Sequence, residues 1–171
     1  MIGWSGCPDA TAENPTVARG WQCALTVPRE LSIRDGKLCQ RPAHEIERMR
    51  GDCVRAIGGE TVEEPGRLFD LVVSCEGTKM VELEIRKGVF VRYADGMLAL
   101  DMGDEGYGRD QRSIELSELR DLRVLSDTTM VEIFANGGEA ALTSRTYSPA
   151  VPAMELHAEG AASMNFYRLA H

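Results

Sequence analysis

Aromatic residues, histidines and long apolar runs are all scarce in this chain. Phenylalanine, tryptophan and tyrosine make up 6% of its 171 residues, and there are three histidines. No run of about 18 apolar residues occurs, so we expect no helix that crosses a membrane. The sequence does not open with a basic stretch followed by an apolar one, so no signal peptide is predicted and a cytoplasmic location is expected.

Positive charge is also in short supply. The chain has 27 acidic and 19 basic residues, which gives a net charge of −8. This balance argues against nucleic acid or an anionic membrane as a partner. The acidic residues are spread along the sequence, as is typical of a solvated surface. The length, with 43% hydrophobic residues, suits one globular domain with a sizeable core.

The cysteines lack the spacing of a metal site. They are odd in number and include no C-x-x-C pair, whereas zinc sites need closely spaced ligands. Three of them, Cys23, Cys39 and Cys75, lie in strand-like stretches, where a thiol packs as a small apolar group. We therefore expect free, buried thiols and no metal or cofactor, with a metal site or a disulfide framework as the alternative. The five cysteines are Cys7, Cys23, Cys39, Cys53 and Cys75.

The strongest periodic pattern in the sequence has a period of two. Apolar residues alternate with polar ones in several stretches, which is typical of strands with one face on a core and one face in water. The apolar rows are Phe69, Leu71, Val73 and Cys75; Val81, Leu83 and Ile85; and Leu98, Leu100 and Met102. The pattern predicts an all-β fold, a sandwich of two antiparallel sheets like a jelly roll.

Turn residues separate these strands. Asp35-Gly36, Asp95-Gly96 and Asn136-Gly137 each lie between apolar stretches and predict two-residue hairpin turns, because both turn residues need a positive φ. The segment 42–50 has proline at a helix-start position and good helix formers behind it, so we expect one short helix there. The last apolar run, 154–169, is interrupted at Gly160 and predicts a closing hairpin.

One hairpin segment carries a family signature. Residues 122–147 read LRVLSDTTMVEIFANGGEAALTSRTY. This segment resembles the C-terminal β-sandwich signature of glycoside hydrolase family 32, the β-fructofuranosidases and sucrose-6-phosphate hydrolases, which is roughly D-x-S-x-V-E-x-F-x-N-D-G-E. The chain departs from the pattern at Thr129 and Gly137. It matches at Asp127, Val131, Glu132, Phe134, Asn136, Gly138 and Glu139.

A second segment resembles the part of the same family that joins its catalytic propeller to the sandwich. Residues 21–42 read WQCALTVPRELSIRDGKLCQRP. The family pattern is W-x-x-x-L-T-L-P-R-E-L-x-L-x-D-G-x-L-x-Q-x-P. The resemblance implies that residues 1–20 are a remnant of the preceding propeller and linker, with an extension packed on the sandwich as the alternative, and that residues 21–171 form the β-sandwich.

The resemblance also implies roles for named residues. The candidates for the interface with the missing propeller are Trp4, Trp21, Leu25, Val27, Arg29 and Glu30. The structural residues of the signature hairpin are Asp127, Glu132, Phe134, Asn136 and Gly138. We expect Asp127 to cap a turn by accepting backbone N–H groups, and Glu132 to pair with an arginine such as Arg123 or Arg145. The expected partners are the catalytic propeller or a second copy of the chain.

The catalytic acids of the resembling family are not found in this sequence. They belong to N-D-P-N, E-C and R-D-P motifs of the propeller, whereas here Arg109-Asp110 is followed by Gln111. No catalytic residue can therefore be assigned, and we expect a non-catalytic module with a structural role in domain packing or dimerisation. The alternatives are an independent carbohydrate-binding module for fructans or sucrose and a stand-alone enzyme of unknown type. Trp4 and Trp21 are the candidate sugar-stacking rings.

Overall fold

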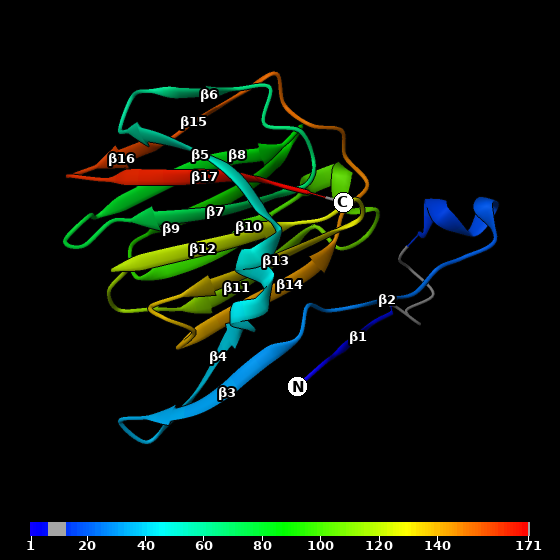
Figure 1. The fold of residues 1–171 in the computed structure, drawn as a ribbon, viewed down its shortest axis with the longest axis horizontal. Helices are drawn as coiled ribbons and strands as arrows, with labels where there is room; N and C mark the ends of the chain where they lie inside the picture. Colours follow the sequence, from blue (N-terminus) through cyan, green and yellow to red (C-terminus); the bar gives the residue numbers. More distant parts are fainter. Residues whose placement is uncertain (7–12, 171) are drawn as a thin grey trace.

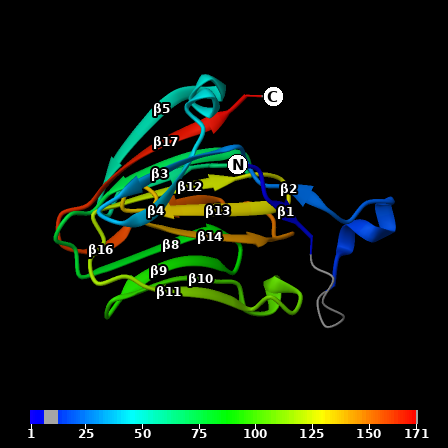
Figure 2. The ribbon, with the colours of Figure 1, turned by 90° about the horizontal axis from the view of Figure 1, so that it is seen from below.

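The computed structural model describes residues 1–6 and 13–170 and shows two antiparallel sheets packed face to face (Figures 1 and 2). The larger sheet has six strands, in the order β14 (Ala140–Arg145), β13 (Met130–Ala135), β12 (Asp121–Ser126), β7 (Phe69–Ser74), β17 (Ser163–Leu169) and β5 (Arg50–Ile57). The smaller has five, in the order β11 (Gln111–Glu115), β10 (Met97–Asp101), β9 (Val89–Ala94), β8 (Met80–Arg86) and β16 (His157–Glu159). The predicted β-sandwich is confirmed.

Short elements surround the sandwich. Three strand pairs lie apart from the main sheets: β1 (Trp4–Ser5) with β2 (Ala24–Leu25), β3 (Arg29–Arg34) with β4 (Lys37–Pro42), and β6 (Thr61–Glu63) with β15 (Ala153–Glu155). The helical segments are 3₁₀ turns, namely η1 (Pro15–Arg19), η2 (His44–Met49) and η3 (Gly103–Gly106). None of the helices formed by the described residues has the length and apolar composition needed to cross a bilayer.

The core lies between the two sheets and contains the rows that the period of two predicts. Phe69, Leu71, Val73 and Cys75 are fully buried in it. The other two predicted rows, which begin at Val81 and Leu98, are buried opposite them. Burial of alternate apolar side chains from both sheets is the main stabilising term in a sandwich of this kind.

One strand is buried on both of its faces. All six residues of β13 are buried, including the outward-facing Glu132 and Phe134. The outer side of the six-stranded sheet is covered here by the β3–β4 hairpin and its neighbours, on the side away from the five-stranded sheet (Figure 2). On this covered outer face, the signature residues Glu132 and Phe134 contact Arg29 of strand β3.

Two of the three predicted hairpin turns have the expected geometry. Asp35 and Gly36 both have positive φ angles, as do Asp95 and Gly96. In the third turn Asn136 and Gly137 also have positive φ angles, but the turn is longer than predicted, because Ala135 pairs with Ala140 and leaves a loop of residues 136–139.

Of three other predictions, one is confirmed, one is wrong and one is correct only in part. The short helix predicted at 42–50 is confirmed as η2, His44–Met49. The closing hairpin at 154–169 is wrong, because β16 pairs with β8 in one sheet while β17 joins the other sheet. The expected burial of the thiols holds for Cys39 and Cys75, whereas Cys23, which precedes the two-residue strand β2, and Cys53 in the edge strand β5 are exposed. Burial raises the pKa of the Cys75 thiol to about 12. Cys7 lies outside the described residues.

Arg86, at the end of β8, is an arginine buried inside the sandwich. Its guanidinium donates to the carbonyl oxygens of Arg67 (2.9 Å) and Ser148 (3.1 Å) and to the Ser126 hydroxyl (2.7 Å). It also bonds the Asp127 carbonyl oxygen, and burial lowers the pKa of Arg86 to about 10. The side chain therefore fixes the turn between β12 and β13 to the end of β8.

Replacing Arg86 should destabilise the fold strongly. Arg86→Met leaves several buried acceptors without a donor, and each such group costs about 1–3 kcal/mol. We expect the free energy of unfolding, measured with urea, to fall by about 3 kcal/mol. The control is Arg92→Met, since Arg92 pairs with Glu82 and Asp101 on the open face of the five-stranded sheet and should cost at most about 1 kcal/mol. Equal losses in the two variants would contradict this role.

Candidate functional site

The candidate site is the contact between the signature hairpin and the segment that precedes the sandwich. Strands β13 and β14 and the turn 136–139 bind residues 27–42 from the outer side of the six-stranded sheet. We call this set of contacts the clamp. Its two halves are about one hundred residues apart in the sequence.

Glu132 occupies the centre of the clamp. Its Oε1 accepts the Val27 N–H (2.7 Å), and its Oε2 pairs with the Arg29 guanidinium. The side chains of Glu132 and Arg29 are only 2% and 8% exposed. A buried ion pair is sensitive to loss of either partner, because the remaining charge is left without compensation.

Further groups contact the Arg29 guanidinium, although its buried Nε has no hydrogen-bond partner among the described residues. Its guanidinium donates to the Thr143 hydroxyl (2.7 Å) and to Gln40 Oε1 (2.8 Å). It also lies over the Phe134 ring, 5.0 Å from the centroid, in a cation–π contact. The expected pairing of Glu132 with an arginine is therefore confirmed, but the partner is Arg29 and not Arg123 or Arg145. Arg123 is bonded to Asp70, and Arg145 holds backbone carbonyls.

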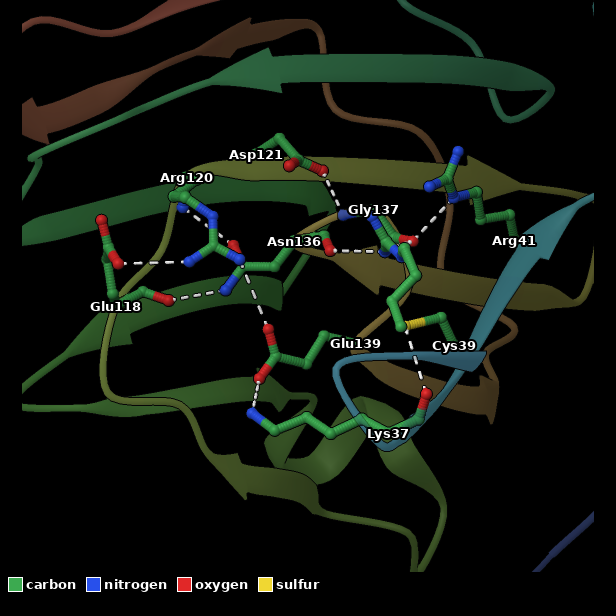
Figure 3. Close-up of polar contacts among 10 residues, drawn as sticks. Lys37, Cys39, Arg41, Glu118, Arg120, Asp121, Asn136, Gly137 and Glu139 are labelled. Carbon is green, nitrogen blue, oxygen red and sulfur yellow. Dashed lines mark hydrogen bonds and ion pairs between the residues drawn. The ribbon is translucent and has the colours of Figure 1, made fainter. Parts of the chain in front are cut away.

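The turn after β13 is fixed from the sandwich side by Asn136. Its amide nitrogen donates to the Glu118 carbonyl oxygen, and its Oδ1 accepts the Arg120 N–H, both at 2.8 Å (Figure 3). Asp121 accepts the Gly137 N–H through Oδ1 (2.8 Å). Asn136 has a φ of 53°, in the left-handed region that asparagine tolerates better than most residues.

The hairpin β3–β4 binds the other side of the same turn. The Gln40 N–H donates to the Gly138 carbonyl oxygen (2.8 Å), and Arg41 Nε donates to the Gly137 carbonyl oxygen (2.8 Å). Arg34 reaches the Asn136 carbonyl oxygen (3.1 Å). Gly138 has a φ of 92°, and a Cβ atom there would overlap the Gln40 carbonyl oxygen. Glycine is therefore required at position 138 both by its φ and by the close approach.

Glu139 adds an ion pair at the exposed edge of the clamp. Lys37 and Arg120 both reach its carboxylate, and the hydrogen bond from Lys37 is the main cause that lowers the pKa of Glu139 (Figure 3). The Lys37 side chain is 64% exposed. Exposed pairs contribute at most about 1 kcal/mol, so this contact orients the hairpin tip more than it stabilises it.

Arginines of the sandwich also hold the residues that precede the clamp. Arg145 donates to the Gln22 carbonyl oxygen (2.9 Å) and lies 5.4 Å from the Trp21 ring centroid. Arg109 donates to the Glu13 carbonyl oxygen (2.9 Å) and to Asn14 Oδ1 (2.7 Å). Neither role could be predicted from the sequence, because the acceptors are mostly backbone carbonyls that leave no sequence signal.

A second buried acid lies next to the clamp. Asp70 is fully buried in β7 and is bonded by Arg50 (2.7 Å) and Arg123 (2.7 and 3.0 Å). Its role was not among the predictions from the sequence. A signal was present, since Asp70 interrupts the otherwise apolar stretch Phe69–Val73 with one charge.

The predicted interface residues fall into two groups. Trp4, Trp21 and Leu25 are 60%, 42% and 63% exposed, whereas Val27 and Arg29 are at least partly buried in the clamp. Glu30 is exposed and accepts a hydrogen bond from the backbone N–H of His44, the first residue of η2. The hairpin adds an exposed apolar row that the prediction did not include, namely Leu31, Ile33 and Leu38. Large exposed apolar patches of this kind mark interaction sites.

One group of side chains in the described part of the chain could hold a metal ion. Donor atoms of Glu30, His44 and Glu45 lie within 4.8 Å of one another, and all three residues are exposed. The hydrogen bond to Glu30 is the main cause that raises the pKa of His44. The imidazole therefore interacts with the two carboxylates most strongly below its raised pKa, and the contact weakens as the pH rises through that value. Nothing in this geometry requires a metal, and the expectation of no metal or cofactor stays a prediction.

Asp127 lies at the turn between β12 and β13. Its Oδ1 accepts the Thr128 N–H (2.6 Å), which is the local contact expected of an acid in a turn.

Within residues 1–6 and 13–170, the clamp carboxylates Glu132 and Glu139 are each paired with a basic side chain. The arrangement therefore serves to hold a polypeptide segment and presents no pair of free carboxylates.

Two family models match the chain in different parts. The model "Glycosyl hydrolases family 32 N-terminal domain" matches residues 1–42, and "Glycosyl hydrolases family 32 C terminal" matches residues 95–169. The clamp joins these two regions, because Val27 and Arg29 lie in the first and Glu132 lies in the second. The domain boundary expected at residue 20 falls inside the first match and stays a prediction.

Curated relatives extend beyond the region that they share with this chain. Raffinose invertase of Escherichia coli is 38% identical over 168 residues, which cover 88% of this chain and 34% of the relative. Sucrose-6-phosphate hydrolase of Salmonella typhimurium is 31% identical over 160 residues, which cover 88% and 32%. The chain spans about a third of the length of the curated relatives that it matches.

Solved structures show the same fold. Sucrose-6-phosphate hydrolase from Lactobacillus gasseri superposes with a TM-score of 0.84 at 20% identity, over 99% of this chain and 38% of that chain. Exo-inulinase from Aspergillus awamori superposes with a TM-score of 0.77 at 19% identity, over 99% and 40%.

Substitution of Gly138 should open the clamp. In Gly138→Ala the new methyl group would overlap the Gln40 carbonyl oxygen, so the hairpin must move. We expect the free energy of unfolding to fall by about 3 kcal/mol and the Gln40 amide to exchange its hydrogen faster, as measured by hydrogen–deuterium exchange mass spectrometry.

The matched control is Gly36→Ala in the tip of the same hairpin. Gly36 also has a positive φ, but its Cβ would meet nothing within 4 Å. Only the backbone strain of about 1–2 kcal/mol is expected there. If both variants lose the same stability and leave exchange at Gln40 unchanged, the close approach at Gly138 does not hold the hairpin.

Proposed function

Because the chain belongs to glycoside hydrolase family 32, we propose that it acts as a non-catalytic C-terminal β-sandwich module of a β-fructofuranosidase-type enzyme. The chain is a family 32 fragment related to sucrose hydrolases. Its role in this proposal is structural, and it consists in packing against the catalytic N-terminal domain.

The observation that carries the proposal is the clamp. The sandwich uses its signature residues to fix a segment that the N-terminal family model includes. Close to that fixed segment, Trp4 and Leu25 remain exposed. Exposed apolar side chains next to a fixed segment suit a partner that buries them, and the catalytic domain is the partner that fits this position.

The chemistry of the parent enzyme would then come from the N-terminal domain. A retaining glycosidase needs two carboxyl groups about 5–5.5 Å apart, one as nucleophile and one as acid/base. The motifs that carry these acids in the family do not occur in this sequence. The reaction proposed for the parent is hydrolysis of sucrose, sucrose 6-phosphate or fructans. A cytoplasmic location, homodimerisation and an independent affinity for carbohydrate stay predictions.

Hydrolysis assays test this proposal directly. The purified chain should release no glucose from sucrose and no glucose 6-phosphate from sucrose 6-phosphate, because it lacks the catalytic acids. The part of raffinose invertase that precedes the shared region, expressed separately, should gain activity on sucrose or thermal stability when this chain is added. Hydrolysis by this chain alone would contradict the proposal, as would no effect of the chain on the added domain.

A further inference from the structure

A groove next to the clamp is lined mostly by apolar side chains. Its volume is about 350 Å³, and it lies between the segment leading into the clamp, η2 and the outer face of the six-stranded sheet. The apolar residues that shape it are Leu25, Val27, Ile46, Met49, Leu125 and Met130.

The groove is lined by residues from both of the regions that the two family models match. Leu25 and Val27 form one wall and lie in the region matched by the N-terminal family model, whereas Met130 in β13 belongs to the C-terminal match. Val27 also donates its N–H to Glu132, so this wall is part of the clamp. The groove is therefore continuous with the proposed domain interface and not a separate hollow elsewhere on the surface.

The groove is open to solvent in this chain. Leu25 is 63% exposed and Met49 is 43% exposed at its rim. Leu125 and Met130 are buried below them. Among the described residues that line the groove there is no aromatic ring on which a sugar could stack. An apolar occupant fits this lining better than a carbohydrate does.

Asp127 supplies a polar group at the edge of the groove. Its Oδ1 is occupied by the N–H and hydroxyl of Thr128, at 2.6 and 3.0 Å. Its Oδ2 accepts no hydrogen bond from any side chain or backbone group in the described ranges 1–6 and 13–170. The other carboxylate in the groove, Glu132, has both oxygens occupied by Val27 and Arg29. The groove therefore combines an apolar floor with one available anionic acceptor.

We propose that this groove receives an apolar side chain of the catalytic domain, and that Asp127 bonds a neighbouring lysine, arginine or backbone N–H of that domain. This inference rests on the proposed function and names the surface through which it operates. It also gives Asp127, a residue of the family signature, a role beyond its local turn. A bond to a carboxylate is charge-assisted and is stronger than a neutral one when its surroundings are dry.

Binding measurements with a defined probe test the groove. The probe is the part of raffinose invertase that precedes the shared region, titrated with this chain in a calorimeter. Asp127→Asn retains an oxygen for the Thr128 N–H but removes the charge, and we expect its affinity to fall about tenfold. Leu25→Asp places a charge on the apolar wall and should weaken binding by tenfold or more.

The matched controls lie on the other sheet. Asp95→Asn changes an exposed acid in the β9–β10 turn, and Met97→Asp changes an exposed apolar residue at the start of β10. Both should bind like the unchanged chain. Far-UV circular dichroism and thermal unfolding show that each variant is folded.

The outcomes separate the two proposals. If the unchanged chain binds but the groove variants bind as tightly as the controls, the groove inference is overturned and the proposed function stands. If the unchanged chain does not bind, the proposed function itself is contradicted. If the probe is insoluble, the same four substitutions are compared in a chimera in which this chain replaces the matching third of raffinose invertase. Only the groove variants should lower its melting temperature.

Discussion

The buried ion pair between Arg29 and Glu132 is the interaction on which the position of the preceding segment depends. Both charges are almost completely removed from water, so each must be compensated within the protein. Glu132 also accepts the Val27 N–H, and Arg29 reaches Thr143 and Gln40. Together these contacts fix the position of the segment that contains Val27 and Arg29 on the outer face of the six-stranded sheet.

This arrangement gives a physical reason for the two sequence motifs that the chain contains. Glu132, Phe134 and Gly138 of the first motif contact Arg29 and Gln40 of the second. The motifs are thus the two sides of one contact. A separate sandwich would have no need for a buried carboxylate on its outer face, since burial of an unpaired charge is costly. In the proposed function, the segment that the clamp holds leads into the catalytic domain.

The sheets could be predicted from the sequence because alternation is a local property of each strand. The rows that begin at Phe69 and Val81 are buried as expected, and the Asp-Gly turns have their expected φ angles. Long-range partners could not be predicted in the same way. Arg29 is 103 residues from Glu132, and nothing local distinguishes it from Arg123 or Arg145. The turn 136–139 is longer than predicted, since the strand pairing ends at Ala135 and Ala140 and places Gly138 in the loop, where its carbonyl oxygen accepts the Gln40 N–H.

A double-mutant cycle on the central pair is the most direct measurement of this account. The free energy of unfolding would be measured with urea for the unchanged chain, Arg29→Met, Glu132→Leu and the double variant. Each single variant should lose about 3–5 kcal/mol because it leaves a buried charge unpaired. The double variant should lose at least about 2 kcal/mol less than the sum of the two. Losses that add within about 0.5 kcal/mol would contradict the claim that this pair holds the segment on the sandwich.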